Sequence, residues 1–288
     1  NQVLINNQHM NTIGIYASEG AEIRQENRGY VQSSNGGLDG INTGTYNNAQ
    51  IVSGDGAIGI YAVGTGTSTE TKINIISGKI IGGSSISSPV PATSIGILGK
   101  KNAEIILGDI TSAPDINMGT DSVSLLIQDK INLNINNVNS QIGANSVFGY
   151  FDKANGDLKN INKINFQNVG ANSILFYIAN NSDVNVDSDF TLTTGGVFPV
   201  TTAGFISENS KISLNNGKTY TTNTGVGLTA QSVNGKTFSD GTTVNIDKSK
   251  TGAENRGTII MTAANAVGIY TKYGASLNDS TGLINITG

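Results

Sequence analysis

One short apolar motif recurs nine times along the chain, and it constrains the fold more than any other feature of the sequence. In its clearest copies it reads Asn-x-Ile-Gly-Ile-Tyr, and the first apolar position of the successive copies is Ile13, Ile58, Ile95, Val123, Val147, Ile174, Ala203, Val226 and Val267. The copies are separated by 45, 37, 28, 24, 27, 29, 23 and 41 residues. Such repetition predicts a repeat array, because each unit buries its apolar side only against its neighbours.

Each copy of the motif is followed by signs of two further strands. A corner and a new alternating segment lie at 20–23, and the apolar residue that ends this range is ten residues after Ile13. The same offset leads from Ile95 to the end of 102–105 and from Ile174 to the end of 181–184. Asn or Gly opens each corner, as expected where the backbone needs a positive φ. A weaker apolar stretch, such as 259–261, precedes the next copy. Three short strands for each repeat predict one coil of a parallel β-helix.

The composition supports strands over helices. Ile and Val total 53 against 14 Leu, and Asn, Gly, Ser and Thr supply 130 of the 288 residues. β-branched side chains favour strands, and the polar residues favour tight corners. We therefore predict an all-β solenoid over 1–288, with about nine coils rising about 4.8 Å each to a length of about 43 Å. A β-propeller is the rival fold, but its blades keep a tighter period and carry Trp or His signatures.

Inward side chains of such coils stack in columns. The first motif position predicts one buried column, which contains Ile13, Ile58, Ile95, Val123, Ile174 and Val267. An Ile174→Asp substitution is then expected to place a charge in the stack and separate the neighbouring coils. Five tyrosines share another motif position and are interpreted as an aromatic column of the scaffold, namely Tyr16, Tyr61, Tyr150, Tyr177 and Tyr270.

The longer repeats predict loops that leave the solenoid. These excursions are placed near 24–57, 62–72, 82–93, 193–202 and 230–257. Loops on a rigid scaffold commonly carry binding residues. Aromatic and charged positions in the two longest excursions are therefore the candidate partner-binding residues, namely Tyr30, Asp39, Tyr46, Asp55, Lys248, Lys250 and Arg256. For each of them, burial under a loop or simple solvation is the alternative.

Several kinds of chemistry find no support in the sequence. The chain has no Cys, a single His, His9, and a net charge of −4 with only 17 Lys and Arg. The absence of Cys excludes thiol chemistry and cysteine-ligated metal sites, and the single His argues against a Ser-His-Asp triad. The few Lys and Arg do not form the basic patch that a nucleic-acid binder needs. A lone Asn-Gly-Gly-Leu-Asp-Gly stretch at 35–40 is interpreted as a turn rather than a calcium site. We expect no catalytic, cofactor or metal site.

The recurring Asn-x-Ile-Gly-Ile-Tyr, followed by Gly-Ala-x-Ile or Asn-Ser-x-Val, resembles the passenger repeats of bacterial type V autotransporters. The Asn-rich, Ile-rich and Cys-free character is most similar to the large fusobacterial outer-membrane adhesins of the RadD-like kind. This resemblance covers the whole chain and implies a right-handed parallel β-helix with extra-helical loops. It also implies a cell-surface location, with attachment to the outer membrane only through a C-terminal β-barrel absent from this chain.

The resemblance implies that the protein attaches its cell to other bacteria or to host cells, as in coaggregation and biofilm formation. The expected partners are protein or glycan receptors on other bacteria or host cells, with no nucleic acid and with the segment acting as a monomer. The first alternative is a polysaccharide lyase or glycoside hydrolase built on a β-helix, which requires several clustered carboxylates. Asp and Glu here mostly occur singly at corners, such as Glu22, Glu104 and Asp183. The second alternative is a structural spacer of the passenger stalk.

Overall fold

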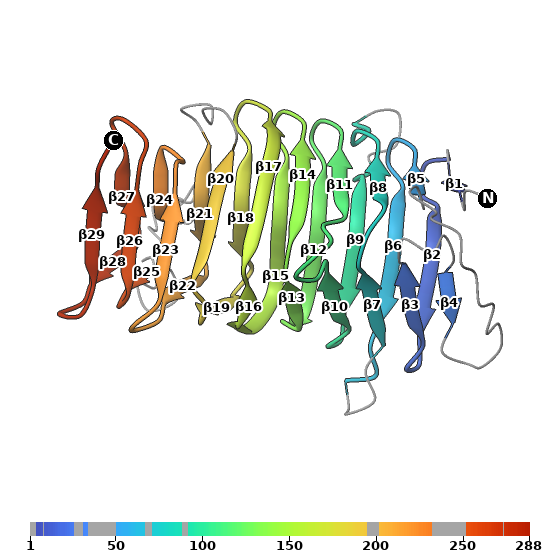
Figure 1. Ribbon diagram of the computed structural model, residues 1–288, viewed down its shortest axis with the longest axis horizontal. Helices are drawn as coiled ribbons and strands as arrows, with labels where there is room; N and C mark the ends of the chain where they lie inside the picture. Colours follow the sequence, from blue (N-terminus) through green and yellow to red (C-terminus); the bar gives the residue numbers. More distant parts are fainter. Residues whose placement is uncertain are drawn as a thin grey trace, which may run out of the picture.

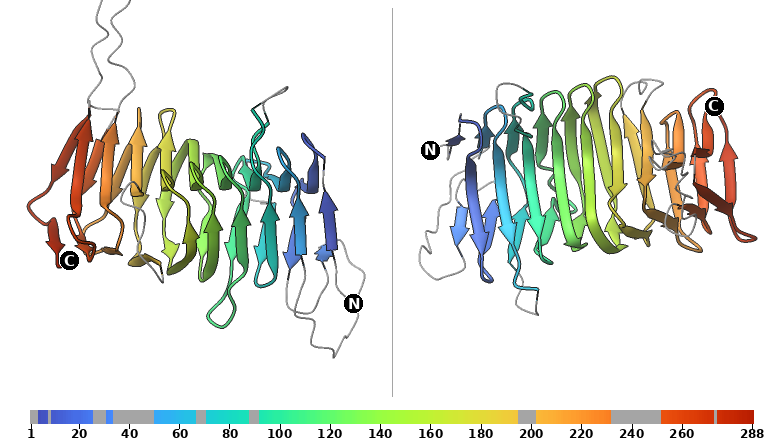
Figure 2. Two further views of the ribbon diagram at one scale, coloured as in Figure 1. Left: turned by 90° about the horizontal axis from the view of Figure 1, so that it is seen from above. Right: turned by 180° about the vertical axis from the view of Figure 1, so that it is seen from behind.

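The protein is a parallel β-helix, seen from the side in Figure 1. The computed structural model describes residues 4–7, 9–25, 31–33, 50–66, 71–87, 92–194, 202–231, 252–272 and 274–288. Within these ranges the chain forms β-strands and turns and contains no helix. The coils stack along the long axis, so the two termini lie at opposite ends (Figures 1 and 2). The all-β prediction is confirmed.

The repeated motif forms the first strand of every coil. Nine such strands pair in parallel in the order β2-β6-β9-β12-β15-β18-β21-β24-β27. We call this the motif sheet. Its strands are β2 (Ile13–Ser18), β6 (Ile58–Val63), β9 (Ile95–Lys100), β12 (Val123–Lys130), β15 (Val147–Leu158), β18 (Ile174–Ala179), β21 (Ala203–Glu208), β24 (Val226–Gln231) and β27 (Val267–Lys272).

The second strand of each coil forms another face of the solenoid. In the first half these strands make a six-stranded sheet of β3 (Glu22–Gln25), β4 (Val31–Ser33), β7 (Lys72–Ile75), β10 (Glu104–Leu107), β13 (Leu133–Ile135) and β16 (Asn160–Ile161). Here β4 is antiparallel to β3, while the other pairs are parallel. The second half continues from the end of β15 through β19 (Asp183–Val186), β22 (Lys211–Leu214), β25 (Gly252–Asn255) and β28 (Ala275–Asn278).

The third strand of each coil closes the solenoid. Ten parallel strands pair in the order β1-β5-β8-β11-β14-β17-β20-β23-β26-β29. They are β1 (Leu4–Asn7), β5 (Gln50–Ser53), β8 (Lys79–Gly82), β11 (Asp115–Met118), β14 (Val138–Ile142), β17 (Lys163–Val169), β20 (Phe190–Thr194), β23 (Thr219–Thr222), β26 (Thr258–Met261) and β29 (Leu283–Ile286). The apolar core therefore runs between three faces along the length of the described coils.

The register of the motif sheet corrects one sequence prediction. The first motif positions do share one column, from Ile13 through Ile58 and Ile95 to Val267. Of the predicted members only Ile95 is buried, because the column lies on the outer face, where Ile58, Val123 and Ile174 are half-buried. Ile13 and Val267 are each 42% exposed. The buried column lies two residues later, where Ile60 and Phe176 are fully buried. The residue between these two positions also points inward, and it is often Gly.

Bulky and small inward residues compensate for each other across the core. Phe176 stacks on Phe205 with ring centroids 4.8 Å apart, and a Cβ at Gly149 would lie 2.5 Å from the Phe176 ring. Tyr220 is fully buried, and its hydroxyl occupies the space beside Gly204. Burial also raises the pKa of the Tyr220 phenol, which stays neutral. The core is thus filled by interlocking sizes rather than by one repeated residue.

The corner before the motif has a repeated backbone conformation. Asn11, Asp121, Asn145, Asn172 and Asn265 all have a φ between 54° and 58°. Asn and Asp tolerate this left-handed region better than other side chains apart from Gly. One residue later, buried serines form a ladder in which the Ser122 amide donates to Ser146 Oγ (3.1 Å) and the Ser146 amide to Ser173 Oγ (3.4 Å). The predicted positive φ is also confirmed at Gly20, Asn102 and Asn181, which open the corners before the second strands, and Asn209 adopts it as well.

Asn145 offers a direct test of this corner. We expect Asn145→Gly to keep the stability of the parent, because Gly adopts a positive φ without strain. Asn145→Val should lose about 1–2 kcal/mol, the cost of the left-handed region for a side chain that cannot tolerate it. Urea unfolding midpoints of the two variants measure the difference. Equal midpoints for the two variants would show that the corner does not depend on this conformation.

The predicted excursions are shorter than the sequence suggested wherever the structure describes them. Residues 50–53 form β5 and residues 252–255 form β25, so both belong to the coils rather than to loops. The remaining excursions also begin or end in strand residues of β6, β7, β8, β20 and β24. Their middles, at 26–30, 34–49, 67–70, 88–91, 195–201 and 232–251, lie outside the described residues.

Candidate functional site

Two of the seven predicted binding residues lie in the described part of the chain, and each makes a hydrogen bond to a neighbouring coil. Asp55 is exposed at a corner, and its Oδ1 accepts a hydrogen bond from the Ser84 amide of the next coil at 2.7 Å. Arg256 Nη2 donates to Asn215 Oδ1 at 2.7 Å, and its Nε lies 3.8 Å from Glu254 Oε1. The two lie near opposite ends of the solenoid, so they do not form one site. Tyr30, Asp39, Tyr46, Lys248 and Lys250 lie outside the described residues.

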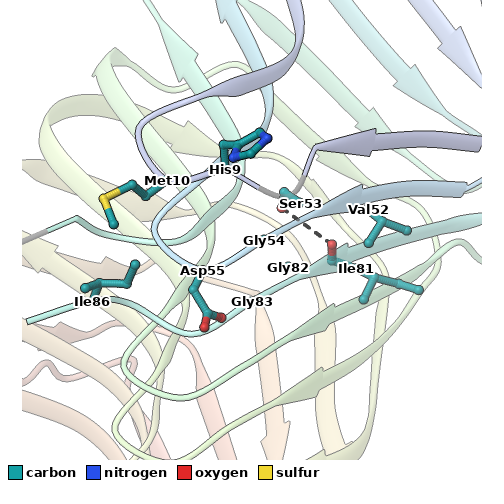
Figure 3. Close-up of a pocket in the computed structure, with 10 residues that line it drawn as sticks. All are labelled: His9, Met10, Val52, Ser53, Gly54, Asp55, Ile81, Gly82, Gly83 and Ile86. Carbon is teal, nitrogen blue, oxygen red and sulfur yellow. Dashed lines mark hydrogen bonds between the residues drawn. The ribbon is translucent and has the colours of Figure 1, made fainter.

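Asp55 also borders an open hollow near the N-terminal end (Figure 3). This hollow has a volume of about 710 Å³, and its lining includes His9, Met10, Ser53 and Ile86. Although a His, a Ser and an Asp meet here, they are not linked as in a catalytic triad. Ser53 Oγ donates to the Ile81 carbonyl at 3.4 Å, and within the described residues no hydrogen bond joins His9 to Ser53 or Asp55.

The outer face of the motif sheet carries a second kind of surface. The repeated tyrosine position forms one in-register column, in which Tyr150 lies beside Tyr177 and is followed by Ile206. The predicted aromatic column is therefore present, but it points outward, and Tyr16 and Tyr270 are 57% and 48% exposed. We call this the tyrosine column, which comprises Tyr16, Tyr61, Leu98, Leu126, Tyr150, Tyr177, Ile206, Thr229 and Tyr270.

A polar column runs beside the tyrosine column. Residues i and i+2 of a strand point to the same face, so each motif tyrosine has an outward neighbour two positions later. This second column consists of Ser18, Val63, Lys100, Gln128, Asp152, Ala179, Glu208, Gln231 and Lys272. The tyrosine column and this second, mostly polar column thus run side by side along the outer face of the motif sheet.

The two columns come together most closely in the middle of the solenoid. The Tyr150 and Tyr177 rings are stacked, with centroids 5.3 Å apart and an interplanar angle of 28°. The Tyr177 hydroxyl donates to Glu208 Oε2, and Gln231 Nε2 donates to the same oxygen at 3.3 Å. We define Tyr150, Tyr177, Asp152 and Glu208, all half-buried, as the tyrosine–carboxylate cluster.

Asp152 is held on the other side of the cluster. Gln128 Nε2 donates to Asp152 Oδ2 and Asn180 Nδ2 donates to Asp152 Oδ1, both at 2.7 Å. Among the described residues, the ion pairs of Lys and Arg involve neither Asp152 nor Glu208. Neutral amides and a phenol therefore orient both carboxylates, and their charges are not cancelled by a neighbouring cation. Such groups form a polar surface with fixed geometry.

The phenols of the cluster stay protonated at neutral pH. Burial raises the pKa of Tyr177 well above its usual range, and the hydrogen bond to Glu208 and that carboxylate's charge raise it further. Burial also raises the pKa of Tyr150, with smaller contributions from the charges of Asp152 and Glu208. A neutral phenol keeps its hydroxyl as a donor, so the Tyr177–Glu208 bond persists across the physiological range.

Sequence reasoning found the tyrosines but missed the carboxylates. Asp152 and Glu208 each stand two residues after a tyrosine-column position, so the period-two alternation within the motif strand was the available signal. At one line of acidic positions a cation is present, since Lys72 lies between Glu22 and Glu104 in register and its Nζ is 3.0 Å from Glu104 Oε2. Within the described ranges no group of three or more His, Cys, Asp or Glu is arranged to hold a metal ion.

Comparison of the chain with protein-family models, with curated proteins and with solved structures finds no match. In the portion of the chain that the structure describes, no helix has the length and apolar character needed to cross a membrane.

Proposed function

We propose that the chain is a surface-exposed adhesive segment of a type V autotransporter passenger that attaches its cell to other bacteria or to host cells. The motif resemblance supports the class of protein, and the tyrosine–carboxylate cluster supports binding. Half-buried rings beside oriented, unpaired carboxylates are a combination that recognition surfaces use and that a simple spacer does not require. This cluster is the single observation that carries the proposal.

A parallel β-helix suits attachment physically. Each coil contacts only its neighbours, so a β-helix can be lengthened by adding further coils. Its outward side chains are then presented at a constant rise of about 4.8 Å for each coil. A receptor then meets a rigid row of groups, and little conformational entropy is lost when the complex forms. Protein and glycan receptors are both compatible with this function.

Binding of the purified chain to cells tests the proposal. We expect the fluorescently labelled chain to bind partner bacteria or cultured host cells saturably, and unlabelled chain to compete with it. A spacer would give no saturable binding to any cell type tested. A polysaccharide-active enzyme would instead release soluble sugars from bacterial or plant polysaccharides incubated with the chain. Either of these two results contradicts an adhesive function.

A further inference from the structure

The tyrosine–carboxylate cluster is the only place in the described chain where stacked outward rings and carboxylates without a cationic partner meet. The Tyr16–Tyr61 pair belongs to the same column, but its rings meet edge-on at 68° and are followed by Ser18 and Val63. The middle of the solenoid therefore combines stacked rings with carboxylates that have no cationic partner. The nature of those groups indicates what they bind.

The carboxylates of the cluster have acceptor capacity left. Each carboxylate oxygen can accept about two hydrogen bonds. Asp152 accepts one bond on each oxygen, and Glu208 Oε2 accepts two, so within the described residues Glu208 Oε1 accepts none. Free acceptors on two half-buried carboxylates are thus available on the outer face for a ligand.

The same cluster also offers donors. Gln128, Asn180 and Gln231 each use one hydrogen of a two-hydrogen amide group to hold a carboxylate. The second hydrogen of each amide group is left for another acceptor. Donors and acceptors are therefore both present in this cluster, and a ligand that uses them all must itself carry groups that both donate and accept.

The rings supply the apolar part of the surface. Tyr150 and Tyr177 are half-buried and stacked face to face along the column, so their ring edges form the outward apolar surface, and Leu126 and Ile206 extend this strip to the neighbouring coils. Aromatic surfaces of this kind bury a flat apolar ligand at low entropic cost, because a phenol ring has few rotatable bonds.

We propose that this cluster is a binding subsite for a neutral glycan, with the C–H face of a pyranose packed across the outward ring edges of Tyr150 and Tyr177 and its hydroxyls hydrogen-bonded to Asp152 and Glu208. A pyranose has an apolar C–H face and a rim of hydroxyls that donate and accept, which matches the rings and the mixed polar groups. This proposal rests on the adhesive function above and names the ligand class of that site.

A cationic peptide fits the cluster less well. Ammonium and guanidinium groups only donate, so the cationic side chain would use the carboxylates alone, and acceptors for the amides of Gln128, Asn180 and Gln231 would have to come from the peptide backbone. Both carboxylates are also already stabilised by neutral donors, which lowers the gain from a further positive charge. The balance of donors and acceptors therefore favours hydroxyls.

The column geometry predicts how a longer glycan lies. The cluster crosses three neighbouring coils through β15, β18 and β21, and the tyrosine column runs along the solenoid axis. An oligosaccharide placed on the rings therefore follows the axis and contacts Leu126 or Ile206 with its next sugar. Affinity is expected to rise from a monosaccharide to a trisaccharide of the same sugar.

The test uses the whole chain on an array of immobilised neutral hexose oligosaccharides, with Lys-containing peptides as the competing ligand class. The best-bound trisaccharide is then titrated into the parent and into Tyr177→Ala, Glu208→Ala and the control Tyr61→Ala. We expect Tyr177→Ala and Glu208→Ala to bind at least about tenfold more weakly, equivalent to about 1.4 kcal/mol. Tyr61→Ala should bind as the parent does. Thermal unfolding of each variant confirms that the outward substitutions leave the solenoid folded.

Three results overturn the glycan proposal. They are no neutral glycan bound above background, peptides bound through the cluster in place of glycans, and an equal loss of affinity in Tyr61→Ala and Tyr177→Ala. If the chain still binds cells in any of these cases, the adhesive function stands and only the ligand class is wrong. If cell binding is also absent, the adhesive function itself fails.

Discussion

Phe176→Asp is expected to unfold the middle of the solenoid. The Phe176 ring is fully buried, stacks on Phe205, and packs against Phe148 with centroids 5.8 Å apart. Removing a buried Phe side chain alone costs about 3–5 kcal/mol. A carboxylate at this position has no partner, so the cost of burying it is added. Because neighbouring coils stabilise one another, we expect the loss to spread along the stack.

Ile174→Asp is the matched control, two residues away on the same strand. Ile174 belongs to the outward column and is half-buried, so a carboxylate there remains hydrated and the coils should stay paired. The first motif position was expected to be the buried one, and the observed register reverses the predicted outcome for Ile174. Thermal unfolding measured by circular dichroism compares the two variants. Equal losses of melting temperature would place both positions inside, contrary to the structure.

Gly170→Ala should also cost considerable stability, for a purely steric reason. A Cβ at Gly170 would lie 2.2 Å from the Ala144 amide nitrogen and 2.4 Å from the Gly143 carbonyl carbon. Both contacts are with backbone of the preceding coil, at the corner between β14 and β15. That corner is held by hydrogen bonds to the coils on either side, from the Gly143 amide to the Met118 carbonyl (3.1 Å) and from the Asn145 amide to the Ala171 carbonyl (2.9 Å). Overpacking of this kind costs roughly 1–3 kcal/mol, and a clash with backbone belongs at the upper end.

Gly252→Ala is the matched control for Gly170. Its Cβ would meet the Ala275 carbonyl oxygen at 3.7 Å and Lys211 Cγ at 3.8 Å, both ordinary van der Waals distances. We expect this variant to keep the parent's stability, since Ala is compatible with a strand position that has room for a methyl group. Urea unfolding of both variants gives the comparison. A loss for Gly252→Ala as large as that for Gly170→Ala would mean that close coil contact is not what requires Gly170.

The candidate site was predictable only in part. The tyrosine position could be read from the motif because Tyr150 and Tyr177 repeat at a fixed place in it. The importance of Glu208 could not, because it lies 31 residues from Tyr177 and meets it only when the strands pair in register. Asp55 and Arg256 were selected for their charge within long repeats, but both turn out to bind neighbouring coils.

The sequence by itself determined that the chain is a stack of three-stranded coils. Nine copies of one apolar motif, the excess of Ile and Val, and Asn or Gly at the corners all act locally, since each reflects the conformational preference of a few adjacent residues. Only the tertiary structure decided which face of the motif strand is buried. The strand begins with one outward residue and then two inward ones, so a simple alternation counted from Ile13 or Ile174 assigns the inside incorrectly. The contact of Tyr177 with Glu208 has the same origin, because pairing between coils sets the neighbours of an outward side chain and no local preference encodes it.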